Sequence, residues 1–217
     1  MENEKETKKR LLECALKEFS EKGYMKASLR NICKEAGVTT GALYFFFKDK
    51  DDLFASLVGE PLFGLQELIK LHFEEEYTDK QKAVKGEVKV SQIALMEGFE
   101  EDLEISSQII QYLFQNKDLF LLLLTKAQGS KFENIVDQMV GMVESHYVGM
   151  YATMKGYRSK REITSEDRFL IHWMAHDQIE IFIHVFVHCK SIKEAIMQIK
   201  NLTTYMIGGW LAVINVK

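Results

Sequence analysis

The sequence predicts an all-α protein, and three observations support this prediction. The 217 residues are rich in residues that favour helix, and they include a single proline, Pro61. Along most of the chain, apolar residues recur at spacings of three and four, as they do on one face of an amphipathic helix. The chain also contains no long run of Gly, Ser or Pro and no internal repeat. We therefore expect packed helices joined by short turns.

The first two helices are predicted between residues 8 and 37. Residues 8–20 carry apolar side chains at positions i, i+3, i+4 and i+7, and Gly23 is expected to end this helix. Ser28 can cap the N-terminus of the next helix, which has the same apolar spacing and ends at Gly37.

A third short helix is predicted to run through Phe47, with Thr39 or Thr40 as its N-cap. Two short helices joined by a glycine turn and braced by a preceding helix form a helix-turn-helix. The sequence therefore predicts a helix-turn-helix DNA-binding domain over residues 1–50.

Longer helical patterns follow, and they predict a second, helical domain over residues 51–217 for ligand binding and dimerisation. The expected helices cover residues 51–76, 80–97, 101–115, 118–127, 131–155, 166–189 and 192–214. Pro61 is expected to kink or break the first of them near Leu57–Pro61, because proline lacks a backbone donor. The alternative is that Pro61 begins a separate helix.

The distribution of charge indicates the type of partner, and the cysteine spacing indicates the cellular compartment. Residues 1–50 contain eleven basic and eight acidic residues, a net charge of +3, whereas the remainder carries −7. A basic head on an acidic body permits nucleic-acid binding by the head. Three widely spaced cysteines suit a reducing cytosol. The charged N-terminus predicts no secretory signal, and no apolar stretch reaches the ~20 residues of a membrane span, so we expect a cytoplasmic protein.

Residues 11–54, "LLECALKEFSEKGYMKASLRNICKEAGVTTGALYFFFKDKDDLF", resemble the DNA-binding domain of the tetracycline-repressor (TetR) family. The matching positions are Ala15, Phe19, Gly23, Tyr24, Ser28, Ile32, Ala36, Gly37, Val38, Gly41, Leu43, Tyr44, Phe47, Lys50, Leu53 and Phe54. The resemblance implies that the head binds operator DNA and that the body forms a homodimer, usually with an effector pocket. The sequence departs from the family at Thr40, where lysine is common, and at Phe45 and Phe46, where tyrosine or histidine is common.

The three consecutive phenylalanines of the third helix cannot share one face, because successive helical residues point about 100° apart. Leu43 and Phe47 fall on one side, which we expect to be buried. Gly41 and Phe45 lie opposite, and Phe46 lies on a flank. An outward phenylalanine can contact thymine methyl groups or deoxyribose in a major groove. The alternative is that the outward rings are exposed without a role or pack on the body.

Polar groups around these rings can hydrogen-bond to phosphates or pair with them and so set the register of the helix on DNA. The predicted DNA contacts are Ser28, Arg30, Thr39, Thr40, Gly41, Tyr44, Phe45, Phe46 and Lys50.

Residues 166–189 and 202–214 are apolar on nearly all sides, which predicts burial against other helices. We expect two helices from each subunit to form a four-helix dimer interface. The predicted contacts are Trp173, Ile181, Phe182, Val185, Phe186, Trp210 and Leu211.

A stripe of polar residues runs along the same segment, with His172, His176, Glu180, His184 and His188 spaced four apart. Histidines at i and i+4 can share a metal ion, but this stripe drifts about 40° at each step and cannot converge on one ion. We therefore predict hydrogen-bonded, half-buried side chains and no metal site. Their clustering predicts a pH-sensitive interface or pocket near the ordinary histidine pKa of ~6.5.

Aromatic and methionine side chains recur in the middle helices, where methionine suits adaptable apolar sites. Together with the resemblance, they predict an effector pocket lined by Phe99, Tyr112, Phe114, Met139, Met142, Met150, Tyr151, Trp173 and His176. Plain core packing is the alternative interpretation.

The sequence therefore predicts a ligand-responsive transcriptional regulator, with repression as its expected action. It would bind a palindromic operator as a homodimer and be released by a small, largely apolar effector. One alternative is a DNA-bound regulator without an effector. The other is a helical metal-dependent enzyme using His172 and His176, which no nucleophile or phosphate-loop motif supports, so we expect neither enzymatic activity nor a cofactor.

Overall fold

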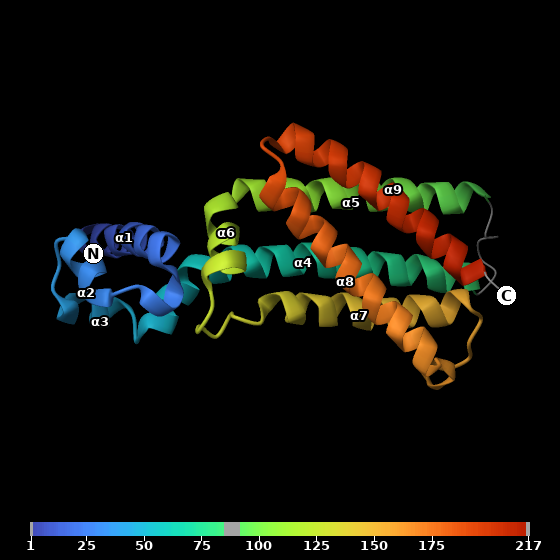
Figure 1. Ribbon diagram of the computed structural model, residues 1–217, viewed down its shortest axis with the longest axis horizontal. Coiled ribbons are helices and arrows are strands. Elements are labelled where there is room, and N and C mark those ends of the chain that lie inside the picture. Colours follow the sequence, from blue (N-terminus) through green and yellow to red (C-terminus); the bar gives the residue numbers. More distant parts are fainter. Residues whose placement is uncertain (1, 85–91, 216–217) are drawn as a thin grey trace. The chain divides into compact units, whose positions relative to one another are not determined.

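The computed structural model describes the backbone of residues 2–84 and 92–215 and the side chains of residues 3–74 and 100–213. Every regular element in these ranges is helical, which confirms the predicted all-α class (Figure 1). The elements are α1 (Glu2–Lys26), α2 (Leu29–Glu35), α3 (Thr40–Phe46), α4 (Lys50–Val84), α5 (Gln92–Gln115), α6 (Lys117–Lys126), α7 (Ile135–Met154), the 3₁₀ turn η1 (Lys160–Glu162), α8 (Ser165–His188) and α9 (Ile192–Asn215).

The helices form two compact units. The first contains the described residues of 1–64 together with 116–135, and the second contains those of 65–115 and 136–217. The helix α4 therefore starts in the first unit and continues into the second after Gly64. The first unit contains the predicted helix-turn-helix but also includes the start of α4, the whole of α6 and the turn that follows it.

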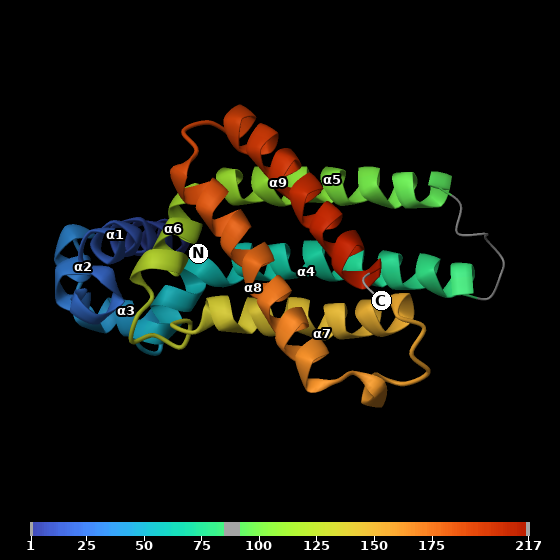
Figure 2. The ribbon, with the colours of Figure 1, turned by 45° about the vertical axis from the view of Figure 1, so that its right-hand side comes forward.

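In the first unit, α1 packs against α2 and α6 (Figure 2). An aromatic cluster joins the end of α1 to the start of α4: the rings of Phe19 and Phe54 are 5.1 Å apart, and those of Tyr24 and Phe54 are 5.3 Å apart. Phe132, in the turn after α6, lies 6.0 Å from the Phe54 ring. Because these rings come from three separate stretches of sequence, they fix the helix-turn-helix to the rest of its unit.

Gly23 interrupts α1 close to the predicted end of that helix. Its φ of 74° and ψ of 161° are not helical, and a further turn then continues to Lys26. The positive φ favours glycine over other residues, because a Cβ atom would be strained there. The sequence correctly located the interruption but not the extra turn.

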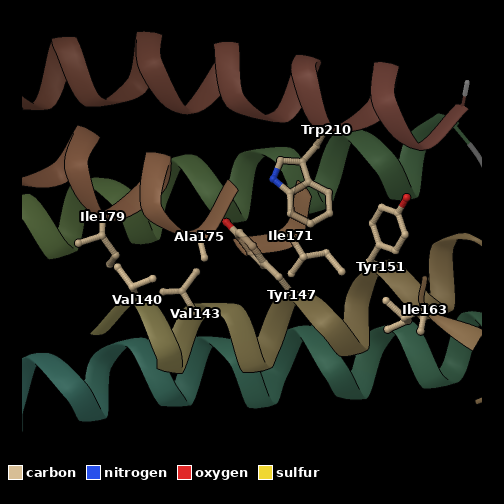
Figure 3. Packing of buried hydrophobic residues seen from close by; sticks show 10 residues of the cluster. Val140, Val143, Tyr147, Tyr151, Ile163, Ile171, Ala175, Ile179 and Trp210 are labelled. Carbon is tan, nitrogen blue, oxygen red and sulfur yellow. The ribbon is translucent and has the colours of Figure 1, made fainter. Parts of the chain in front are cut away.

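In the second unit, α9 packs along α5 and also contacts α8. Figure 3 shows the apolar core between α7, α8 and α9, with Val143 and Tyr147 facing Ile171 and Trp210. The rings of Tyr147 and Trp210 meet edge to face at 4.6 Å. A hydrogen bond of 3.1 Å between the buried hydroxyls of Thr203 and Ser106 links α9 to α5.

The start of α8 is fixed by a capping box. The Thr164 hydroxyl accepts from the Asp167 backbone N–H at 3.1 Å, and the Asp167 carboxylate accepts from the Thr164 N–H at 3.0 Å. The same carboxylate accepts from the hydroxyls of Tyr151, at 2.7 Å, and Tyr157, at 3.2 Å. Burial acts to raise the pKa of Asp167, but these hydrogen bonds outweigh it and lower the pKa overall.

Pro61 does not interrupt its helix. The helix α4 runs from Lys50 to Val84 with Pro61 inside it, so the predicted break and the alternative of a new helix starting at Pro61 are both wrong. A proline removes one backbone hydrogen bond from a helix, while the rest of the ladder remains. Buried Val58 and Leu62, on either side of Pro61, hold the helix to the core through this point.

No helix in the described part of the chain is long and apolar enough to cross a membrane.

Candidate nucleic-acid interface

The turn between α2 and α3 and two side-chain caps define the helix-turn-helix. Gly37 follows α2 with a φ of 65°, which a residue with a side chain rarely adopts. Thr39 then caps α3, since its Oγ1 accepts from the Ala42 N–H at 3.2 Å. Ser28 caps α2 in the same way, accepting from the Asn31 N–H at 3.4 Å. The predicted caps are therefore confirmed, and Thr39 rather than Thr40 is the cap of α3.

The α3 helix separates its large side chains between two faces, as its periodicity predicts. Leu43 and Phe47 are 0% and 1% exposed, whereas Tyr44 and Phe45 are 54% and 73% exposed. Phe46 is half-buried between them. Two large aromatic rings that lie in solvent on one short helix form a candidate contact surface.

The three phenylalanines form a chain of rings from the core to the surface. Phe47 lies in the core, and its ring centroid is 6.3 Å from that of Phe46. The Phe46 ring in turn meets the Phe45 ring edge to face, at 5.0 Å and 87°. The Phe45 ring is therefore exposed but supported on one side, which reduces the rotamer freedom that it would lose on binding.

Most of the polar residues predicted to contact DNA lie at the surface of α2 and α3. Arg30, Thr39, Thr40 and Gly41 are exposed, and Ser28 is half-buried. The hydroxyls of Ser28 and Thr39 accept bonds within their own caps, yet each still carries a proton that can be donated to a phosphate. These residues stay predicted contacts.

Lys50 differs from the other predicted contacts. Its ammonium donates to the Met25 carbonyl at 3.2 Å and lies 4.6 Å from the centre of the Tyr24 ring. Burial lowers its pKa, against the opposing effect of Asp51. The structure therefore gives Lys50 partners within the domain, where it satisfies a carbonyl at the end of α1. Its ammonium carries further N–H donors, so its contact with DNA stays a prediction.

A buried carboxylate, which the sequence gave no reason to single out, joins α1 to the start of α2. Glu18 accepts from Lys22 Nζ at 2.8 Å and from the Ser28 backbone N–H at 3.0 Å. Burial acts to raise the pKa of Glu18, but the bonds from Lys22 and Ser28 lower it overall. Its contact is ten residues distant in sequence, so no helical periodicity could have revealed it.

Lys8 is a second residue that the sequence did not single out. It is exposed, and its ammonium lies 5.6 Å from the centre of the Phe47 ring, next to the end of α3. Lys8 precedes buried Leu11 by three residues, so it lies on the face of α1 that packs against the core. This spacing of three residues is the sequence signal that could have identified Lys8. Together with exposed Lys48, it adds positive charge beside α3.

The predicted effector-contacting residues lie in different surroundings. Met139 and Met150 pack against the core that contains Tyr151, and Phe114 meets Phe186 edge to face at 5.7 Å. Tyr112, Met142 and His176 are half-buried. Trp173 is 63% exposed, and its contact with an effector stays a prediction. The side chain of Phe99 lies outside the described residues. The remaining residues stay predictions.

Four of the seven predicted dimer contacts belong to the core of a single protomer. Phe182, Val185, Phe186 and Trp210 are buried, so their prediction as contacts between subunits is wrong. A helix that is apolar on most sides does not reveal from periodicity which face meets its own chain. Ile181 is half-buried, and Trp173 and Leu211 are exposed.

Exposed apolar residues that the sequence prediction omitted lie on the same two helices, namely Phe169 on α8 and Met197 and Tyr205 on α9. Phe169 precedes Trp173 by four residues, and Met197 precedes Tyr205 by eight. Each pair therefore shares one face of its helix, and this spacing could have identified them.

The histidine stripe divides into separate contacts. His172 Nδ1 is 2.8 Å from Glu144 Oε2 on α7, and the His172 and His176 rings are 4.7 Å apart. The exposed His184 and His188 rings stack at 4.1 Å. Within the residues that the structure describes, no three metal-binding side chains come together. The stripe lies on the partly exposed side of α8.

The helix-turn-helix thus presents aromatic rings, hydroxyls and cations, and the segment that contains it is similar to known proteins. Residues 11–57 match the family described as "Bacterial regulatory proteins, tetR family". The chain is 34% identical over 102 residues to the HTH-type transcriptional regulator AcrR of Shigella flexneri, covering 38% of this chain and 47% of that protein. It is 41% identical over 64 residues to the HTH-type transcriptional repressor BepR of Brucella suis biovar 1 (strain 1330), covering 30% and 31%. The matched segments thus span less than half of either relative.

The solved structures that it resembles include a transcriptional regulator from Aquifex aeolicus VF5, with a TM-score of 0.55. That likeness has 19% sequence identity and covers 92% of this chain and 99% of the other. It extends the shared fold beyond the helix-turn-helix to both compact units.

Proposed function

The chain belongs to the tetR family of bacterial regulatory proteins, and we propose that it is a transcriptional repressor that binds operator DNA through α3. The observation that carries this proposal is the division of α3 into a buried face and an exposed aromatic face, within the segment that matches the family. A helix of this kind, presented by a helix-turn-helix, fits the width of the major groove. The relatives described above are a transcriptional regulator and a repressor by name.

The proposed DNA contacts would fall into two groups, those to base edges and those to phosphates. Tyr44 and Phe45 would face base edges, because they lie on the exposed side of α3. Ser28, Arg30 and Thr39, at the N-terminal ends of α2 and α3, would bind phosphates and set the register. Gly41, with no side chain on the exposed face, would let the helix backbone approach the bases closely.

We further propose that the protein acts as a homodimer through the exposed faces of α8 and α9. Residues 201–213 contain no charged side chain, and their exposed positions include Tyr205, Gly208 and Leu211. An uncharged helix face with small residues lets a second helix pack closely. Phe169 and Trp173 add exposed aromatic area on α8. Two-fold pairing would present two α3 helices to the half-sites of a palindrome.

The dimer proposal has a direct test in sedimentation velocity. Tyr205→Glu would place a charge on the proposed interface and should shift the protein from dimer to monomer. Lys193→Glu, on an exposed position at the start of the same helix, is the matched control and should leave the dimer intact. A wild-type protein that sediments as a monomer at micromolar concentration would contradict the proposal.

We also propose that the second unit binds a small, largely apolar effector whose binding favours a state with lower affinity for DNA. Met139, Met150 and Phe114 supply adaptable apolar surface there. Thermal-shift screening of small molecules tests this point, and a ligand that raises the melting temperature should also release operator DNA. A regulator of this kind would act in the cytoplasm.

The primary test of function is selection of bound duplex DNA from a random pool. The proposal predicts enrichment of a two-fold symmetric site with half-sites about one helical turn apart. Tyr44→Ala and Phe45→Ala should keep the melting temperature but lose affinity for that site. If no sequence is enriched, or if both variants bind as tightly as wild type, α3 is not the DNA-reading helix.

A further inference from the structure

We propose that Phe45 recognises thymine methyl groups in the major groove and is the main residue through which α3 distinguishes base pairs. This inference rests on the proposed function, DNA binding through α3, and adds the chemistry of the sequence that it selects. It follows from which side chains α3 carries, which of them reach solvent and how the Phe45 ring is held.

The composition of α3 limits what the helix can read. Its seven residues, TGALYFF, include no Arg, Lys, Asn, Gln, Asp or Glu. Paired hydrogen bonds to guanine come from Arg or Lys, and those to adenine come from Asn or Gln. Within α3, only the hydroxyls of Thr40 and Tyr44 can hydrogen-bond to a base edge through a side chain. Discrimination by this helix must therefore depend largely on apolar contact.

The major groove offers one apolar group for such contact, the C5-methyl of thymine. Phe45 is the most exposed large apolar residue of α3, and it is the aromatic residue opposite buried Leu43 and Phe47. Tyr44 is less exposed and ends in a hydroxyl, which suits a phosphate or a polar base edge. Among the exposed side chains of α3, Phe45 is therefore the best matched to a methyl group.

The packing of the Phe45 ring adds geometric selectivity. Phe46 meets it edge to face at 5.0 Å, and Phe46 is itself supported by Phe47 in the core. A ring supported in this way has less freedom to follow a methyl group that is displaced to another base pair, so contact with that methyl group would weaken. A freely rotating side chain would tolerate such a displacement.

Arg30 on α2 is an exposed alternative in the helix-turn-helix for reading bases, through guanine. Its contribution and that of Phe45 can be separated, because removal of a methyl group from thymine leaves every guanine contact unchanged. We therefore expect the selected half-site to contain at least one thymine whose methyl group, rather than its hydrogen-bonding edge, determines affinity.

The test uses the duplex selected by the full-length protein, with deoxyuridine replacing each thymidine in turn at symmetric positions of both half-sites. This change removes only the methyl group and preserves base pairing. One pair of positions should weaken wild-type binding about fifteenfold, or about fourfold for each methyl group, which corresponds to ~0.8 kcal/mol for each buried carbon. At the same positions, Phe45→Ala should lose less than twofold.

A second duplex tests whether the methyl group itself is sufficient. Cytosine at the sensitive position should weaken binding, and 5-methylcytosine should restore part of it, because its methyl group occupies the same place in the groove. This recovery should be absent in Phe45→Ala, whose folding is checked by thermal melting.

The outcomes separate the inference from the proposed function. Operator binding that is insensitive to deoxyuridine at every position, or a sensitivity that persists fully in Phe45→Ala, overturns the role of Phe45 and leaves DNA binding through α3 intact. A wild-type protein that enriches no duplex at all overturns both.

Discussion

Adjacent residues of α3 have opposite surroundings, and this difference determines what each contributes. Phe47 fills the core of the helix-turn-helix, whereas Phe45 lies in solvent. A buried ring contributes to stability through burial and packing, while an exposed ring contributes only when a partner covers it. The helical angle of about 100° per residue was enough to predict this division from the sequence.

Alanine substitutions should separate the two roles. Phe47→Ala should leave a cavity and reduce the free energy of unfolding by about 3–5 kcal/mol. Phe45→Ala should change it by less than ~0.5 kcal/mol, because the side chain is exposed. Urea denaturation of both variants measures the difference. Equal losses of stability would show that Phe45 is part of the core.

Lys50 has a structural role that the sequence did not indicate. Lys50→Met keeps the apolar stem but removes the ammonium from the Met25 carbonyl and the Tyr24 ring. We expect the free energy of unfolding to fall by about 1–2 kcal/mol. The exposed neighbour provides the control, and Lys48→Met should change stability by less than ~0.5 kcal/mol.

Salt dependence of DNA binding tests whether Lys50 also contacts a phosphate, as the sequence predicts. A lost phosphate contact lowers the slope of log affinity against log salt by about 0.9. Lys50→Met should lower that slope by this amount, since the ammonium has N–H donors beyond the one bound to Met25. A folded variant with an unchanged slope would remove Lys50 from the DNA contacts.

At the scale of elements, the N-termini of α2, α3 and α8 depend on side-chain caps, and α8 is the clearest case. Asp167 completes the capping box and also accepts from Tyr151 and Tyr157. Because the pKa of Asp167 is lowered in the folded protein, its carboxylate stabilises the fold above the unfolded value of ~3.9. That contribution is lost as the pH falls through the folded pKa.

Asp167→Asn should therefore be less stable than wild type by about 2 kcal/mol at pH 7. The difference in unfolding free energy should shrink as the pH falls below ~3.9, since the carboxyl is protonated first in the unfolded chain and at lower pH in the folded protein. Urea denaturation of both proteins at pH 7 and pH 3.5 measures it, and comparison of the two cancels the other acidic groups. A difference that is independent of pH would contradict the role of the charge.

Substitution of Pro61 tests whether α4 is continuous through residue 61. Within an unbroken helix, proline is about 3 kcal/mol less favourable than alanine. Pro61→Ala should thus raise the free energy of unfolding, by up to ~3 kcal/mol, whereas the exposed neighbour Glu60→Ala should change it by less than ~0.5 kcal/mol. Reduced stability in Pro61→Ala would indicate that the backbone around residue 61 requires proline.

At the scale of the whole molecule, local patterns predicted the fold class and the helix-turn-helix but not the contacts between distant segments. The caps Ser28 and Thr39 act within three residues, so sequence spacing revealed them. Glu18 accepts a hydrogen bond from a backbone N–H ten residues away, and the Phe54 ring packs near Phe132, 78 residues later in the sequence. Helical periodicity relates only residues within a few turns and therefore predicts neither contact. The packing that buries Phe182 and Trp210 within one protomer depends on such distant contacts, and their prediction as contacts between subunits was accordingly wrong.

Binding of the wild-type protein and of Phe45→Ala to the DNA selected from a random pool tests the central claim most directly, that α3 reads an operator. We predict that wild type enriches a two-fold symmetric site and that Phe45→Ala, with an unchanged melting temperature, binds this site at least tenfold more weakly, a loss of ~1.4 kcal/mol or more. Equal affinity of the two correctly folded proteins for the selected site would contradict the claim.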